Sequence, residues 1–308
     1  MFTLNISEDT IDKFASFVNE TAQSKSLIVS GPKGIGKKYI VEAFLKKQLL
    51  INELVHHNLL LLDAEHENIP IEQVRKVHDF VYKTSYDQKS KFVVINAVDK
   101  LNMHAYNSLL KILEEPTKGT IFILISSHYK LLPATIKSRC VTIKFHPASK
   151  TEANRIVRSH FSDIASDDLE KYCYLAKYAP FRALKLIESD YLVSYKSLIE
   201  LLLDFFKEPE QSFKRFDKML KNTDQNLLCH AFSHVITKAI LYVAKKGDYD
   251  SPVEGERELI KQILYLHPTM PQLLLLEEKI KELLVSLDRS KLSKQSVFLI
   301  VIYKLMYK

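Results

Sequence analysis

The sequence predicts an α/β domain with a parallel sheet over residues 1–147, followed by a part of the chain that is helical throughout. Short apolar runs of strand length, among them LLLL (59–62), FVVIN (92–96) and IFILIS (121–126), alternate with amphipathic helical patterns. Apolar strands that alternate with helices are typical of a parallel sheet covered on both faces. In addition, three of the six glycines lie between positions 31 and 36. Glycine serves where the backbone takes a positive φ or approaches a ligand closely, so this cluster indicates a specialised loop.

The elements of this domain follow one another in a regular order. SLIVS (26–30) has the apolar run of a buried strand, and KKYIVEAFLKKQLL (37–50) follows it as an amphipathic helix. Four apolar residues of that helix are spaced for burial on one face: Ile40, Ala43, Phe44 and Leu49. Later strand and helix patterns alternate over 59–62, 71–81, 92–96, 102–114, 121–126 and 141–145.

Length and composition exclude several classes of protein. The chain has 308 residues, of which 46% are hydrophobic and 26% are charged, as expected for a globular protein of two or three domains. No uninterrupted apolar run reaches about 18 residues, and MFTLNISEDT at the start lacks the basic and apolar regions of a signal peptide. Three scattered cysteines favour neither a disulfide framework nor a zinc site. We therefore expect a cytoplasmic protein with no membrane span.

The charge of the chain is compatible with two interpretations. The formal net charge is +7 and the isoelectric point is about 9.0. Such a basic balance suits a protein that works near nucleic acid. The lysines are spread along the sequence without a dense basic block, however, so ordinary solvation explains the charge equally well.

The loop after the first strand carries most of a phosphate-binding motif. GPKGIGKK (31–38) fits the P-loop pattern G-x-x-x-x-G-K-[ST] at its two outer glycines and at Lys37, and Gly34 is the third glycine of the loop. The preceding strand and the following helix supply the context that this motif requires. Lys38, however, occupies the position of the hydroxyl that ligates Mg²⁺. The sequence thus predicts a degenerate P-loop formed by Gly31, Gly34, Gly36 and Lys37; the alternative is a plain strand-to-helix turn.

A second part of the ATPase machinery is also altered. P-loop ATPases end one strand in an Asp that holds Mg²⁺, often followed by a Glu that polarises the attacking water. Here the strand ends in FVVINAVDKL, so Asn96 and Ala97 occupy those positions. Loss of a general base alone costs about 10²–10⁴-fold in rate. We therefore expect no ATP hydrolysis and no metal site. The alternative is that Asp99 replaces the missing acid, although it lies past the strand end.

One long stretch closely resembles a known family. AYNSLLKILEEPTKGTIFILISSHYKLLPATIKSRC (105–140) is similar to the signature of bacterial DNA polymerase III clamp-loader subunits, which carry an NALLKxLEEP helix and an LxPTIxSRC segment. IPIEQVRKVHDFV (69–81) matches the same family. The resemblance covers most of residues 25–190, and the two altered motifs are most similar to its delta-prime type, the non-hydrolysing AAA+ member. The zinc module common in such subunits is absent, because no cysteine occurs between positions 38 and 90.

The resemblance implies a role for the SRC segment. It implies that Arg139, with Ser138 beside it, reaches the ATP of a neighbouring subunit as an arginine finger in trans. A guanidinium stays charged and can form two parallel hydrogen bonds to phosphate oxygens. The alternative is a surface arginine that pairs with a nearby carboxylate. Cys140 is interpreted as a small packing residue rather than a nucleophile.

Other positions in the signature have weaker implications. Ser126 and Ser127 fall at the sensor 1 position of the family and are interpreted as relics. Glu114 and Glu115 are interpreted as solvated or structural carboxylates near a subunit interface. Arg182 lies one residue away from the sensor 2 position, so we do not expect it to contact nucleotide.

The rest of the chain is predicted to be helical. SKTE (149–152) is a capping box that opens a helix, and Pro180 begins another. The predicted fold is therefore an AAA+ P-loop domain (1–147), a three-helix lid (148–190) and an all-helical collar for oligomerisation (191–308). In the collar, one apolar stripe favours either bundle core or a partner surface: Leu273, Leu276, Ile280, Leu283 and Leu287.

Together these features predict a non-catalytic scaffold of the clamp loader. The resemblance implies other clamp-loader subunits as partners in a hetero-pentameric ring, part of a DNA polymerase holoenzyme. It also implies contact with the sliding clamp and primer–template DNA through that complex, and no membrane. We expect no cofactor, with residual binding of ATP or ADP left open. The alternative is an active AAA+ ATPase, a motor subunit or a helicase loader, with unusual Mg²⁺ ligands.

Overall fold

The computed structural model describes residues 14–18, 25–63, 71–83, 90–205, 207–247, 251–286 and 293–306. Residues 69 and 70 of the signature stretch and Leu287 of the apolar stripe lie outside these ranges. The chain divides into two compact units. Unit 1 comprises residues 1–164 and 175–184, and unit 2 comprises residues 165–174 and 185–308. The predicted lid segment is thus shared between the units, and its standing as a separate domain stays a prediction.

Unit 1 is built on a five-stranded sheet in the order β2-β3-β4-β1-β5. All its strand pairs are parallel, as predicted. The strands are β1 (Lys25–Ser30), β2 (Leu59–Asp63), β3 (Lys91–Asn96), β4 (Thr120–Ser126) and β5 (Val141–Lys144). The helical segments are α2 (Lys37–Leu49), α3 (Ile71–Tyr82), η1 (Val98–Lys100), α4 (Met103–Glu114), η2 (Tyr129–Leu131), α5 (Ala134–Lys137) and α6 (Lys150–His160).

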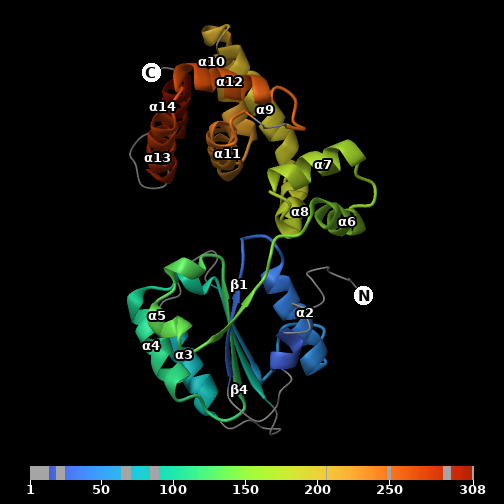
Figure 1. The fold of residues 1–308 in the computed structure, drawn as a ribbon, viewed down its shortest axis with the longest axis vertical. Coiled ribbons are helices and arrows are strands. Elements are labelled where there is room, and N and C mark those ends of the chain that lie inside the picture. Colours follow the sequence, from blue (N-terminus) through green and yellow to red (C-terminus); the bar gives the residue numbers. More distant parts are fainter. Residues whose placement is uncertain are drawn as a thin grey trace. The chain divides into compact units, whose positions relative to one another are not determined.

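Helices cover both faces of this sheet (Figure 1). On one face, α3, α4 and α5 pack on side chains such as Val93, Phe122 and Leu124. On the other face, α2 and the helical residues 14–18 pack on side chains such as Val94 and Ile123. This two-sided burial explains why the strands are apolar along their whole length. The predicted parallel-sheet α/β core is therefore confirmed.

One detail of the predicted helix after the P-loop is wrong. Ala43 is exposed, whereas Val41 and Leu45 are fully buried with Ile40. Phe44 and Leu49 are partly buried against the same core. The buried stripe is therefore rotated by about one residue from the predicted one, because the position of α2 against the sheet, rather than apolarity alone, selects the residues that face the core.

Unit 2 is helical in its described part. It contains α7 (Ser166–Leu175) up to Tyr174, the end of α8 (Pro180–Glu188), α9 (Tyr191–Phe205), α10 (Pro209–Asn222), α11 (Gln225–Ala244), α12 (Glu256–Leu266), α13 (Met270–Ser286) and α14 (Lys294–Met306). In the apolar stripe of α13, Leu273, Leu276 and Ile280 are buried. Three of its four described residues therefore belong to the core of unit 2.

A polar cluster lies inside unit 2. The carboxylate of Glu256, at the first position of α12, is completely buried. It accepts hydrogen bonds from the hydroxyls of Tyr174 (2.8 Å) and Tyr195 (2.5 Å). His234 Nε2 lies 3.7 Å from the same carboxylate, and Lys238 Nζ lies 3.6 Å from the centre of the Tyr174 ring. These residues come from α7, α9, α11 and α12, so the cluster joins four helices.

Within the described residues, one helix is long and apolar enough to cross a membrane by length and composition. This is α11, and 44% of its most apolar stretch is buried inside the protein. Core helices of globular proteins meet the same criterion. The sequence analysis predicted no membrane span because it looked for an uninterrupted apolar run. In α11 the polar residues Ser233, Thr237 and Lys238 interrupt the apolar run.

Candidate functional site

The candidate site lies at the carboxyl ends of β1, β2, β3 and β4. Open parallel sheets bind ligands at this edge, where the direction of the strand order changes. The P-loop connects the end of β1 to α2, whose N-cap is Gly36. Gly34 and Gly36 have φ of +84° and +101°, a conformation that other residues adopt only with strain. The loop thus has the backbone turn that the predicted P-loop requires, and its binding of phosphate stays a prediction.

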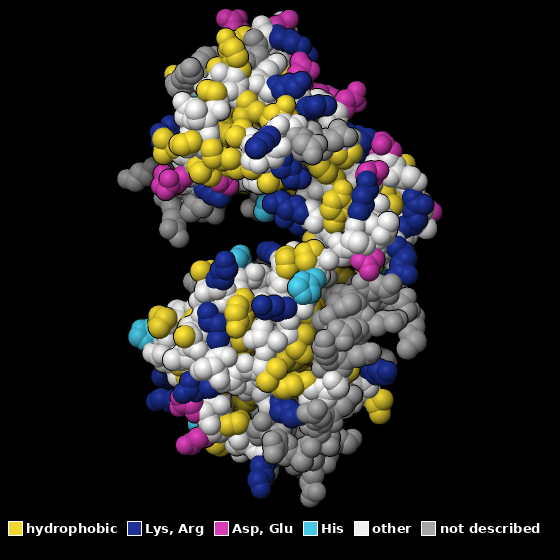
Figure 2. Space-filling model, viewed as in Figure 1, with side chains coloured by type: hydrophobic (Ala, Val, Ile, Leu, Met, Phe, Trp, Pro, Cys, Tyr) yellow, Lys and Arg dark blue, Asp and Glu magenta, His cyan; other side chains and the backbone are white. Residues whose placement is uncertain are grey.

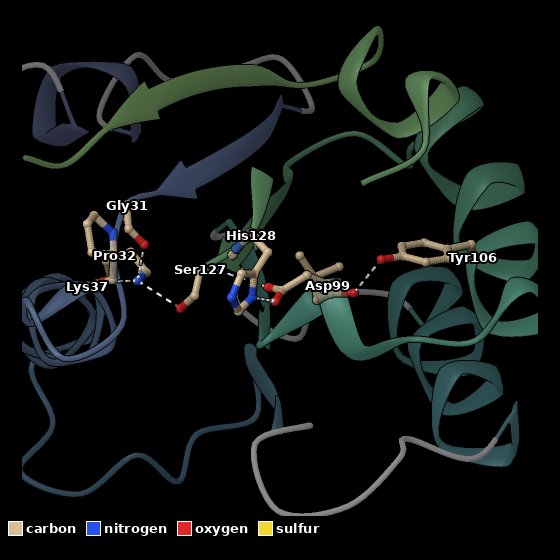
Figure 3. A network of polar contacts seen from close by, with 9 residues as sticks. Gly31, Pro32, Lys37, Asp99, Tyr106, Ser127 and His128 are labelled. Atoms are coloured by element: carbon tan, nitrogen blue, oxygen red, sulfur yellow. Dashed lines mark hydrogen bonds and ion pairs between the residues drawn. The ribbon is translucent and has the colours of Figure 1, made fainter. Parts of the chain in front are cut away.

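The P-loop lysine is bound to its own loop. Lys37 is buried, and its Nζ donates hydrogen bonds to the carbonyl oxygens of Gly31 (2.6 Å) and Pro32 (2.7 Å). It also donates to Ser127 Oγ (3.1 Å) at the end of β4 (Figure 3). The structure therefore brings the predicted P-loop residues and the sensor 1 serine together in one network. The hydrogen bond to Ser127 helps to hold the Lys37 side chain in place. Ser127 therefore has a structural contact in addition to its place at the sensor 1 position.

The residues at the expected metal positions bind a carboxylate that the sequence reading missed. Lys38 Nζ lies 2.7 Å from Asp63 Oδ2, and Asn96 Nδ2 donates to Asp63 Oδ1 at 2.9 Å. Asp63 and Asn96 are opposite each other in the register of β2 and β3. Lys38 Nζ also lies 3.8 Å from Glu42 Oε1. Burial raises the pKa of Glu42, and the positive charge of Lys38 offsets only part of this effect. In the sequence, a role for Asp63 is indicated by its position at the end of the apolar strand 59–62.

This arrangement does not fit a catalytic Mg²⁺ ion. P-loop ATPases hold the metal with a hydroxyl after the P-loop lysine and with a strand-end carboxylate. Here the first position carries the ammonium group of Lys38, which repels a divalent cation. The second carries the neutral amide of Asn96. Ala97, which follows, has no group that could orient a water molecule.

The first turn of α8 lies on the P-loop. The backbone N–H groups of Phe181 and Arg182 donate to the carbonyl oxygen of Gly34 at 3.0 and 3.2 Å. A Cβ atom on Gly36 would lie 2.6 Å from the ring of Phe181, and that ring packs 4.8 Å from the ring of Tyr39. The loop thus accepts from two N–H groups in the first turn of a helix, where N–H groups lack the usual intrahelical acceptor; that of Arg182 is shared with the carbonyl oxygen of Ala179 (3.0 Å). The sequence did not predict this contact.

The side chain of Asp99 binds the residues that follow β4. Its side chain is only 4% exposed; Oδ1 accepts from Ser127 N (3.0 Å) and Oδ2 lies 2.8 Å from His128 Nδ1 (Figure 3). Burial raises the pKa of Asp99, but hydrogen bonds from His128, Ser126 and Ser127 outweigh it and lower the pKa overall. Both oxygens are engaged, so these contacts favour a structural role over replacement of the missing acid.

The predicted finger is paired with a carboxylate of its own chain. Arg139 follows α5, and its NH2 lies 2.5 Å from Glu114 Oε1 at the end of α4. Its NH1 donates to the carbonyl oxygen of Thr135 (3.0 Å) and to Ser138 Oγ (3.4 Å). The alternative of a surface ion pair therefore describes its state in the isolated chain. Cys140 packs against the core, and burial raises its pKa to about 12, so it is no nucleophile.

The parallel sheet and the glycine-rich loop between β1 and α2 define an α/β domain with the topology of P-loop proteins. Residues 46–149 match the sequence-family model described as DNA polymerase III, delta subunit. The DNA polymerase III subunit delta' of Pseudomonas aeruginosa is 33% identical over 133 residues, 37% of this chain and 40% of that protein. The subunit gamma of Buchnera aphidicola (Schizaphis graminum) is 28% identical over 142 residues, 41% of this chain and 39% of that protein.

These matches confirm the resemblance to DNA polymerase III clamp-loader subunits. The matched parts cover about two fifths of those two relatives. A solved gamma subunit-related protein from Thermotoga maritima aligns with 97% of this chain and 99% of its own, with a TM-score of 0.50 and 17% identity. At this identity the solved structure supports the fold alone.

Proposed function

We propose that this chain is a delta-prime-like subunit of the replicative DNA polymerase III clamp loader and acts as a non-catalytic scaffold. The observation that carries the proposal is the binding of both Lys38 and Asn96 to Asp63, at 2.7 and 2.9 Å. In hydrolysing P-loop proteins the two matching positions hold Mg²⁺, which neutralises the charge that develops on the phosphate. With an ammonium group and an amide there, and Ala97 in place of a base, the chain lacks the groups for hydrolysis.

The second part of the proposal concerns Arg139, which would act at the ATP site of a neighbouring subunit. Its side chain is 34% exposed, in the segment between α5 and β5, so it is accessible to a partner. A guanidinium is permanently charged and has the planar geometry that fits phosphate oxygens. Arginine fingers of this kind accelerate hydrolysis by about 10³–10⁵-fold. Ser138 caps α5 beside it and accepts one of its hydrogen bonds.

The proposed partners are the other clamp-loader subunits, in a ring of five. Contact with the sliding clamp and with primer–template DNA would then come through the complex. The relatives named as delta' and gamma subunits support such partners. On the face drawn in Figure 2, Lys and Arg side chains are spread among hydrophobic ones without a dense basic block. The proposed setting is the cytoplasm.

A second candidate function is an active AAA+ ATPase, such as a motor subunit or a helicase loader. The similarity to the gamma subunit from Buchnera, at 28% identity, supports this alternative. It would require an unusual set of Mg²⁺ ligands, and Lys38, Asn96 and Ala97 all argue against that.

Two measurements test the proposal. The isolated chain, given ATP and Mg²⁺, should show no turnover above background; a rate of about 1 s⁻¹, within the usual range for enzymes, would support the active ATPase instead. In a complex reconstituted with the other clamp-loader subunits of the same genome, Arg139→Ala should leave assembly intact and reduce both ATPase and clamp loading. Lys137→Ala, at the last residue of α5 and two residues before Arg139, is the matched control for loss of a positive charge. Equal activity of Arg139→Ala and wild type in an assembled complex would refute the finger.

A further inference from the structure

Glu114 and Arg139 come from two different helical elements and meet at the surface of unit 1. Glu114 is the last residue of α4, and Arg139 lies immediately beyond the C-cap of α5. The carboxylate oxygen Oε1 and the guanidinium NH2 are 2.5 Å apart, so the two side chains form a charge-assisted hydrogen bond. The second terminal nitrogen, NH1, donates to Thr135 O and to Ser138 Oγ.

These contacts engage both terminal nitrogens of the guanidinium, the groups that a phosphate would bind. A bidentate arginine–phosphate interaction uses two parallel N–H groups of the planar fork. NH1 already donates to two intramolecular acceptors, and NH2 donates to one. A phosphate that bridges the two terminal nitrogens would therefore compete with these acceptors for Arg139.

The contact with Glu114 is the one suited to exchange. Both side chains are partly exposed, Arg139 at 34% and Glu114 at 49%, and ion pairs of such exposure are held weakly. A phosphate group of a nucleotide carries more charge than one carboxylate and accepts two hydrogen bonds in the same plane. The bonds to Thr135 and Ser138 remain within one helical turn and keep the arginine near its place.

We propose that Glu114 is a latch that holds Arg139 away from the neighbouring nucleotide until the subunits close on each other. The latch rests on the proposed function, because it regulates the same arginine finger. Glu114 is thus a positioning residue, which acts on the reaction only through Arg139. Before closure it competes with the phosphate for NH2, and after closure it is released to solvent.

The test uses the reconstituted clamp loader and the variant Glu114→Gln, which keeps the shape of the side chain and removes its charge. Without primed DNA and sliding clamp, ATP turnover should rise by up to about five-fold, the factor that an exposed ion pair is worth. With DNA and clamp present, turnover should equal that of the wild type, because the latch is then already open. Glu115→Gln, the neighbouring exposed carboxylate, removes the same charge and should change neither rate.

The variants of Arg139 separate the latch from the finger. The double variant Glu114→Gln/Arg139→Ala should have the low rate of Arg139→Ala alone, because the latch has nothing else to hold. If Arg139→Ala lowers turnover while Glu114→Gln behaves as Glu115→Gln does, the latch is refuted and the finger stands. A fall in turnover in Glu114→Gln also refutes the latch, since Glu114 would then assist Arg139. Unchanged turnover in Arg139→Ala overturns the finger and the latch together.

Discussion

The ammonium group of Lys38 lies 2.7 Å from the carboxylate of Asp63, across the edge of the sheet where P-loop proteins bind their metal. Asn96 holds the second oxygen of the same carboxylate. The residues at positions 38 and 96 are therefore linked, because both side chains bind the carboxylate of Asp63. A positively charged side chain stands at the sequence position where hydrolysing P-loop proteins carry a hydroxyl ligand of Mg²⁺.

The first prediction follows from this linkage. Restoring one position alone, by Lys38→Thr or by Asn96→Asp, should not create Mg²⁺-dependent ATPase activity in the isolated chain. The Mg²⁺ ion requires both ligands, and the attacking water requires a glutamate at position 97, where this chain has Ala97. The measurement is phosphate release at saturating ATP with and without Mg²⁺. Hydrolysis by either single variant well above the wild-type background would contradict this account of the altered site.

Much of unit 1 could be predicted from the sequence because its signals are local. Apolar strand runs, the glycine cluster and the strand-end substitutions Asn96 and Ala97 are visible without tertiary information. The face that α2 buries was partly mispredicted, since Ala43 is exposed and Val41 is buried. That error arose because the packing of a helix against the sheet cannot be read from apolarity alone.

The partners of the site could not be predicted, because they come from distant parts of the chain. Asp63 meets Lys38 through the order of strands in the sheet, and Phe181 meets the P-loop through the position of α8. Glu114 was recognised as a surface carboxylate, but its pairing with Arg139 depends on how α4 and α5 end beside each other. Long-range contacts of this kind leave no spacing or periodicity in a single sequence.

The second prediction concerns the pH dependence of stability through Asp99. Its folded-state pKa lies below the ordinary value of 3.8, so the carboxylate stabilises the fold above about pH 4. This contribution is lost as the pH falls through the folded pKa. Asp99→Asn should therefore lower the free energy of unfolding by about 1–3 kcal/mol at pH 7, the cost of losing hydrogen bonds to a buried charged group.

Urea denaturation at pH 7 and at pH 3 measures this effect. The difference between wild type and Asp99→Asn should shrink at the lower pH. Asp79→Asn is the control, because the Asp79 side chain is 72% exposed and its loss should change stability by less than about 0.5 kcal/mol. An Asp99→Asn penalty that stays the same at both pH values would mean that the charge of Asp99 does not stabilise the fold.

The third prediction tests the contact between α8 and the P-loop. Gly36→Ala places a Cβ atom at a φ of +101° and 2.6 Å from the ring of Phe181. Gly119→Ala has a similar backbone strain at a φ of +76°, but its Cβ meets open space. The left-handed conformation alone costs about 1–2 kcal/mol, so Gly119→Ala should lose about that much. Gly36→Ala should lose clearly more, and equal losses in urea denaturation would show that Phe181 yields without cost.

The fourth prediction concerns the buried carboxylate in unit 2. Tyr195→Phe removes a hydroxyl that donates to Glu256, a residue that is completely buried. Hydrogen bonds to charged groups contribute about 1.5–3 kcal/mol, and a buried carboxylate that loses a donor cannot turn to water instead. We therefore expect a loss of this size in the free energy of unfolding. Tyr174→Phe, which removes the other hydroxyl, should act similarly.

The control for this prediction lies on the same helix as Glu256. Tyr265 of α12 is 85% exposed, so Tyr265→Phe makes the same chemical change at the surface and should alter stability by less than about 0.5 kcal/mol. The double variant Tyr174→Phe/Tyr195→Phe should lose more than the sum of the single losses, because each hydroxyl partly compensates for the absence of the other. Denaturant melts followed by circular dichroism provide the four values. If Tyr195→Phe is no less stable than Tyr265→Phe, the cluster around Glu256 does not hold these helices together.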